Sequence, residues 1–183
     1  NMLKQLSPRF SASYSLRDNL FINFNTGRFY QQPSYTTLGY KNPAGVLINK
    51  ENDLKYIAVD HIVAGIEWLP AEDSKITVEG FYKNYDKYPF SVADSVSIGS
   101  KSADFGVFGN EEVLSIGQGR AYGAELLYRE QMIKGFSIIL SYTLVRSEFK
   151  DAFGSNFPSS WDNRHIVNLT LQKKLPRNWD IGA

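Results

Sequence analysis

Apolar and polar residues alternate with a period of two along most of this chain, which is typical of β-strands with one apolar face. The clearest example is residues 61–68, where Ile62, Ala64, Ile66 and Trp68 alternate with His61, Val63, Gly65 and Glu67. Apolar residues do not recur at the spacing of an amphipathic helix over any long window. The chain is therefore predicted to be all-β.

The same alternation predicts about eight long strands, with boundaries that are accurate to a few residues. They are expected at residues 8–16, 20–29, 58–69, 75–85, 118–129, 135–148, 163–173 and 178–183. The most regular of them are as long as the roughly 9–11 residues that a β-strand needs to cross a membrane.

Short and long connections follow one another in strict alternation between these strands. The short ones are near residues 17–19, 70–74, 131–134 and 174–177, and the long ones are 30–57, 86–117 and 147–162. In an antiparallel up-and-down meander, alternate connections lie at the same end of the sheet, so the long loops meet at one end. Outer-membrane β-barrels separate short turns from long loops in this way.

Three aromatic residues lie close to the expected short turns: Tyr14, Trp68 and Trp179. Such a row is typical of the aromatic belt at a membrane interface. A soluble β-sandwich whose core holds these aromatics is the alternative that this pattern leaves open, because aromatic residues are enriched in all β-strands.

Composition excludes several kinds of chemistry. A formal net charge of +1 over 183 residues gives no basic surface for nucleic acid. The chain has no cysteine, which excludes a disulfide framework, a thiolate zinc site and a cysteine nucleophile. Its two histidines, His61 and His165, each follow a long loop and are expected to make hydrogen bonds at strand ends rather than to bind a shared metal.

The glycine-rich stretch at residues 117–123 does not match a dinucleotide-binding motif. Its spacing is G-x-G-x-x-x-G, and no strand–turn–helix context surrounds it. We expect it to be a strand whose inward face has small residues. With no catalytic constellation elsewhere, the chain is not predicted to be an enzyme, and no cofactor or metal is expected.

The start of the first long loop is the best candidate for ligand binding. Arg28, Gln31, Gln32 and Tyr35 are predicted to contribute to a substrate vestibule, since loops at the mouth of a barrel are where ligands first make contact. Capping of the strand end is the alternative role for these side chains. The polar residues Asn23, Asn25, Glu67 and Glu125 are expected on the inward face, and Arg28 at the rim.

Five segments, in order along the chain, resemble strand motifs of the TonB-dependent outer-membrane receptors. They are LSPRFSASY at residues 6–14, GRFYQQP at 27–33, DHIVAGIEW at 60–68, GRAYGAE at 119–125 and WDNRHIVN at 161–168. The resemblance implies a transmembrane β-barrel of about 22 strands. Residues 1–183 would then be a C-terminal part of the barrel, with the plug domain and the remaining strands absent.

The resemblance also implies a function and partners. Such receptors bind scarce nutrients outside a Gram-negative cell, such as a siderophore, a saccharide or a peptide, and import them with energy supplied by TonB. The partners would be outer-membrane lipid, the receptor's own plug domain and the TonB complex, the last two through the missing N-terminal part. A self-contained eight-stranded barrel with a structural or adhesive role and a soluble lipocalin-like carrier are the alternatives. An isolated fragment with open edges is expected to self-associate.

Overall fold

The computed structural model describes residues 5–101, 109–133 and 135–183. Within these residues, nine strands form one antiparallel sheet. They are β1 (Arg9–Arg17), β2 (Leu20–Gln31), β3 (Ile57–Ala71), β4 (Ser74–Ser91), β5 (Val113–Ile133), β6 (Phe136–Lys150), β7 (Asn156–Pro158), β8 (Arg164–Leu175) and β9 (Trp179–Gly182). The long strands pair in chain order as a meander, and β7 pairs with β6 beside this path. The prediction of a single up-and-down sheet is confirmed, and a two-sheet sandwich is excluded.

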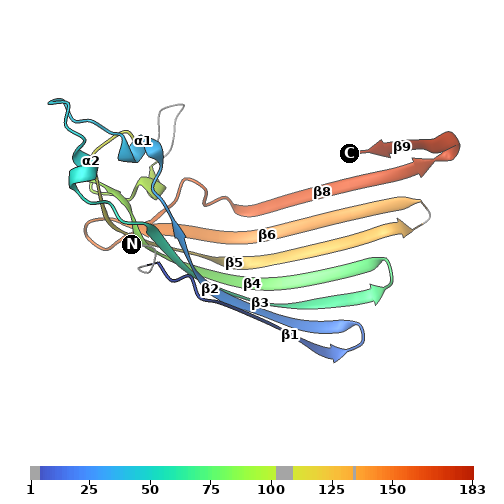
Figure 1. The fold of residues 1–183 in the computed structure, drawn as a ribbon. Helices are drawn as coiled ribbons and strands as arrows, with labels where there is room; N and C mark the ends of the chain where they lie inside the picture. Colours follow the sequence, from blue (N-terminus) through green and yellow to red (C-terminus); the bar gives the residue numbers. More distant parts are fainter. Residues whose placement is uncertain (1–4, 102–108, 134) are drawn as a thin grey trace.

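The two ends of the sheet differ as the connection lengths predicted (Figure 1). Tight turns lie at one end, and the long loops gather at the other. The loop end also holds two short helices, α1 (Tyr35–Leu38) and α2 (Ile48–Glu51). Two short 3-10 segments complete the elements, η2 (Ile98–Ser100) among the loops and η3 (Pro176–Asn178) at the last turn.

Two strands are longer than the period-two pattern predicted, and one strand was missed. β4 continues to Ser91 and β5 begins at Val113, so this hairpin extends well into the region that was expected to be loop. Irregular register near Tyr88 lets the pair continue while it bends. β7 falls inside the expected loop 147–162, where its three residues carry no alternating pattern.

The register of the strands aligns their apolar residues into rows across one face. One such row, near the turn end, consists of Leu20, Trp68, Ile76, Tyr128, Leu140 and Leu169. A row on the opposite face consists of Asn23, Gly65, Glu79, Glu125, Thr143 and Ile166. The sheet therefore has one apolar and one mostly polar face, as the sequence predicted.

In a soluble sheet the apolar face is the buried one, but here the apolar face is more exposed than the polar face. Ile62, Ile66 and Val78 on the apolar face are each 50% exposed. The residues between them on the polar face, such as Val63 and Glu79, are only partly exposed. Side chains crowd one another on the concave side of a curved sheet, so the polar face is the inner one. An outer apolar face of this extent needs lipid or protein to cover it.

Candidate functional site

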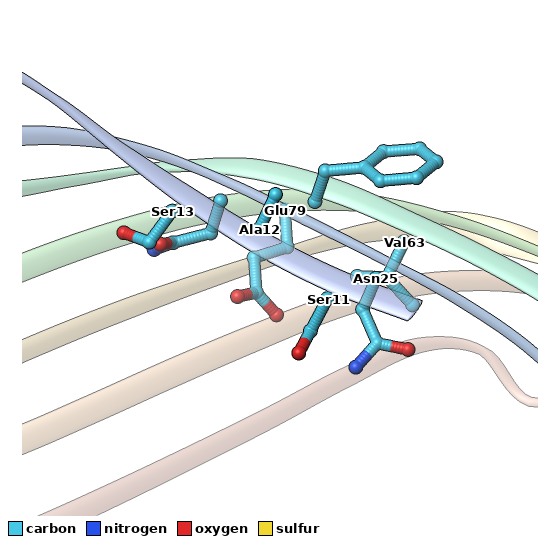
Figure 2. Close-up of a pocket in the computed structure, with 8 residues that line it drawn as sticks. Ser11, Ala12, Ser13, Asn25, Val63 and Glu79 are labelled. Carbon is cyan, nitrogen blue, oxygen red and sulfur yellow. The ribbon is translucent and has the colours of Figure 1, made fainter. Parts of the chain in front are cut away.

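A polar cavity of about 340 Å³ lies on the inner face near the first three strands. Its polar lining consists of Ser11, Ser13, Asn23, Asn25 and Glu79. Figure 2 shows the labelled members of this group, Ser11, Ser13, Asn25 and Glu79, directed to the same side of the sheet. The cavity thus offers hydroxyl, amide and carboxylate groups beside the apolar residues Ala12, Phe24 and Val63.

Gly65 makes room for the carboxylate of this cavity. A Cβ atom on Gly65 would lie 2.6 Å from Cγ of Glu79 on the neighbouring strand. The side chain of Glu79 therefore passes over β3 at the one position where the strand has no side chain.

Acidic residues cluster closer to the turn end of the inner face. Glu79 lies directly opposite Glu125, and among the described residues neither forms an ion pair. Like charges directly opposite each other on paired strands repel. Glu67, by contrast, has a salt bridge with Lys75. These residues line a second polar cavity of about 290 Å³. The predicted inward positions of Asn23, Asn25, Glu67 and Glu125 agree with the two cavities.

A basic and aromatic row crosses the inner face closer to the loop end. Arg9, Gly27, His61 and Lys83 are successive partners across β1 to β4. Phe29 lies between two of them: its ring is stacked on His61 at 4.5 Å between centroids, and the guanidinium carbon of Arg9 lies 4.2 Å from its centre. We refer to Arg9, Phe29, His61 and Lys83 as the basic row.

The small residues of β5 allow bulky groups to approach closely. A Cβ on Gly119 would overlap the ring of Phe149, and a Cβ on Gly123 would overlap the carbonyl oxygen of Leu144. Phe149 is fully buried, and its neighbours Tyr85, Tyr88 and Trp161 complete an aromatic cluster below the loops. The structural interpretation of the glycine-rich stretch is therefore supported.

Asn49 joins two of the long loops, and sequence reasoning missed it. Its side-chain amide donates to the carbonyl oxygens of Thr37 (2.7 Å) and Glu111 (2.8 Å), and its Oδ1 accepts from the backbone N–H of Val113 (2.9 Å). The residue is fully buried. A single asparagine in a polar loop gives no pattern that could have revealed this role. The loop end is consequently a packed cap.

Lys101 adds an electrostatic connection within this cap. Its ammonium group forms salt bridges with Asp94 and with Glu111, the latter at 2.6 Å. Partial burial lowers the pKa of Lys101, but the hydrogen bonds and attraction of the two carboxylates outweigh it, so the pKa lies above the ordinary lysine value. Lys101 therefore stays charged through the neutral range.

The four residues predicted for the vestibule all lie at the loop end, but they do not converge. Arg28 has the orientation of the outer face and forms a two-bond ion pair with Asp60, at 2.9 and 3.0 Å. Gln31 ends β2 opposite Ile57. Tyr35 begins α1 and is 85% exposed. Gln32 lies in the segment between them. Their contact with a substrate stays a prediction.

The two histidines have separate partners. His61 lies on the inner face and is 3.2 Å from Oδ1 of Asn25, whereas His165 lies opposite Leu144 in the outer face and is 2.8 Å from the hydroxyl of Tyr142. In the parts of the chain that the structure describes, no group of three or more His, Cys, Asp or Glu side chains could hold a metal ion. None of the helices in those parts has the length and apolar character to cross a membrane.

Segments of larger solved receptors have a fold similar to that of this sheet. The ferric-catecholate import receptor Fiu of E. coli K12 is 17% identical with a TM-score of 0.64 over 95% of this chain and 23% of its own. The ferripyoverdine receptor of the Pseudomonas aeruginosa outer membrane is 15% identical, with a TM-score of 0.63 over 96% of this chain and 22% of its own. The ferric yersiniabactin uptake receptor FyuA of Yersinia pestis is 16% identical, with a TM-score of 0.63 over 95% of this chain and 24% of its own.

These similarities concern the fold, and the chain spans about a quarter of the length of each receptor. No curated protein sequence matches the chain significantly. The family described as "TonB dependent receptor-like, beta-barrel" matches residues 3–183, which is nearly the whole chain. The chain therefore belongs to the β-barrel family of the TonB-dependent receptors, which are proteins of the Gram-negative outer membrane.

Proposed function

We propose that this chain is part of the barrel wall of a receptor that binds a scarce extracellular nutrient and imports it with energy supplied through TonB. The observation that carries the proposal is the family match over residues 3–183. The open sheet, with its exposed apolar outer face and polar inner face, supports it. Two of the similar receptors are described as import or uptake receptors for ferric compounds, and a third as bound to ferripyoverdine, so a ferric chelate is the first cargo to test.

In this proposal the parent protein supplies what the segment lacks. Further strands pair with β1 and β9 to close the barrel, because unpaired strand edges in lipid cost several kcal/mol for each unsatisfied group. A plug domain fills the lumen against the polar inner face and connects to the TonB complex. The segment itself contributes wall and loop surface, and it performs no covalent chemistry.

The loops would form part of the external vestibule. Asn49 holds the first long loop to Glu111 and to the start of β5, and Lys101 joins Asp94 to Glu111 within the second long loop, so the ligand would meet a surface with a defined shape. In this proposal Arg28, Gln31, Gln32 and Tyr35 would contribute to the edge of this surface. A preformed surface lowers the entropic cost of binding.

An immunoblot of fractionated native cells tests the proposal. An antibody against this segment is expected to detect a protein far larger than 20.7 kDa in the outer-membrane fraction. Cells that lack this protein and cells that lack TonB should fail to accumulate the same cargo. A 20.7 kDa band, in membrane or soluble fraction, would contradict the proposal.

A further inference from the structure

We infer that the basic row on the inner face binds an anionic ligand, and that the cargo of this receptor is a negatively charged chelate rather than a neutral compound. The inference rests on the proposed function and names the substrate class for it. The relevant side chains are Arg9, His61 and Lys83, with Phe29 between the first two.

The fold brings these side chains together from four strands. Arg9, His61 and Lys83 share one row of the register, and Gly27 occupies the position between Arg9 and His61. A Cβ on Gly27 would lie 3.1 Å from Cγ of Arg9 and 3.2 Å from the ring of Phe29. The glycine therefore allows the arginine stem and the aromatic ring to lie against the sheet.

The positive charge of this row is not neutralised within the described residues. No salt bridge there involves Arg9 or Lys83, although both point to the polar inner face, and the side chains of the neighbouring rows, Ser11, Asn25, Val63 and Tyr85, are uncharged. On the outer face at the same end, Arg28 and Arg120 are ion-paired with Asp60 and Glu148.

The nearest inward carboxylates form no ion pair with the row among the described residues. The Cα atoms of Glu79 and Lys83 lie four residues apart along β4, roughly 13 Å at about 3.3 Å per residue. The Nζ of Lys83 instead lies 5.4 Å from the centre of the Phe81 ring. An anion entering from the loop end would therefore meet unneutralised positive charge before it reached Glu79 and Glu125.

The chemistry of the row suits a large oxyanion with delocalised charge. Arg9 presents a planar guanidinium that can donate two parallel hydrogen bonds. Its stacking on Phe29, with the guanidinium carbon 4.2 Å from the ring centre, restrains its position. Lys83 adds a point charge, and His61 holds the ring of Phe29 by stacking while its own Nε2 bonds to Oδ1 of Asn25. These groups match the clustered oxygens of a ferric chelate with a net negative charge.

The test compares two ferric complexes of similar size on the purified intact receptor. The iron(III) tris-catecholate complex carries a threefold negative charge, and the iron(III) tris-hydroxamate complex is neutral. Quenching of the receptor's intrinsic fluorescence measures the affinity of each. We expect the tris-catecholate to bind, and the double variant R9Q/K83Q to bind it about tenfold more weakly or worse. Added salt should weaken wild-type binding and have less effect on the variant.

Matched controls separate the loss of a site from the loss of folding. The double variant R17Q/R177Q removes two positive charges at the short turns: Arg17 ends β1, and Arg177 lies in η3 at the last turn. It should bind the tris-catecholate as the wild type does. K83R keeps the charge and should retain most of the affinity.

Three results would overturn the inference: equal affinity of R9Q/K83Q and the wild type, binding of the neutral complex alone, and binding of neither complex. Unchanged affinity together with a lower thermal stability of R9Q/K83Q would show instead that carboxylates elsewhere in the receptor neutralise the row. The proposed function would survive each of these results if TonB-dependent uptake of another cargo persisted, and it would fail only if no such uptake existed.

Discussion

At the scale of single residues, Asn49 shows how one buried amide can order a whole loop region. All three of its hydrogen bonds go to backbone groups of other segments. An Asn49→Ala substitution would remove the side-chain partners of the Val113 N–H and the Glu111 carbonyl oxygen, and would leave the Thr37 carbonyl oxygen with the N–H of Tyr40 at 3.5 Å. We expect the loop cap to lose about 3 kcal/mol of stability. Hydrogen exchange of residues 35–52 in the intact receptor would measure the loss as faster exchange.

Asn42 is the matched control for this substitution. Among the residues that the structure describes, its Oδ1 accepts hydrogen bonds from the backbone N–H groups of Ala44 and Val46, within its own turn. Asn42→Ala should therefore cost about 1 kcal/mol or less and leave exchange near Asn49 unchanged. Equal exchange in the two variants would show that Asn49 does not hold the loops together.

Gly80 and Gly123 provide a second comparison between neighbouring strands at the same height. A Cβ on Gly123 would overlap the carbonyl oxygen of Leu144, whereas the nearest atom to a Cβ on Gly80 is 3.9 Å away. Gly123→Ala is expected to lower stability by about 2 kcal/mol, and Gly80→Ala to leave it unchanged or raise it by up to about 1 kcal/mol. Thermal unfolding of the receptor in detergent would rank the variants, and a reversed order would contradict the close approach.

At the scale of a strand, successive side chains of β2 should face the lipid and the lumen in alternation. Ile22 lies in the apolar outer face and Asn23 in the polar inner face. Because residues 1–183 contain no cysteine, a cysteine at either position gives a single labelled site within this segment. In lipid, a label at residue 22 should collide with oxygen and a label at residue 23 with a water-soluble nickel chelate. A lipocalin-like carrier, with apolar residues inside, would show the opposite pattern.

The period-two pattern predicted the strands well because the two faces of the sheet lie in different environments, one apolar and one polar, and alternate side chains must match them. It placed Asn23, Asn25, Glu67 and Glu125 on the inner face, and the two cavities there agree. It missed β7 and the far part of the β4–β5 hairpin. Those segments lie beyond the apolar band, where packing against the loops decides the conformation.

The basic row could not be predicted in the same way. The side of the sheet follows from sequence alone, but the register that sets Arg9, His61 and Lys83 side by side depends on how four strands align. The position of Asn49 depends on the path of loops with no periodic pattern. The strands of the barrel wall can therefore be predicted from the sequence more readily than the groups that could contact a ligand.

At the scale of the whole molecule, the described sheet is an open structure with two free edges. β1 pairs only with β2 and β9 only with β8, and every residue of β1 is exposed. Both edges and the apolar outer face can pair with other chains. In a closed barrel the neighbouring strands and lipid would cover these surfaces.

The isolated chain of residues 1–183 is therefore predicted to self-associate. Detergent covers the apolar face but cannot satisfy the backbone N–H and C=O groups along β1, so association through strand edges should persist in detergent micelles. Sedimentation velocity of the refolded chain, corrected for bound detergent, should give dimers or larger species that contain β-structure by circular dichroism. The intact receptor, in which both edges are paired, should sediment as a monomer under the same conditions. A folded, monomeric 20.7 kDa species would mean that β1 and β9 close on each other, which would favour a small self-contained barrel.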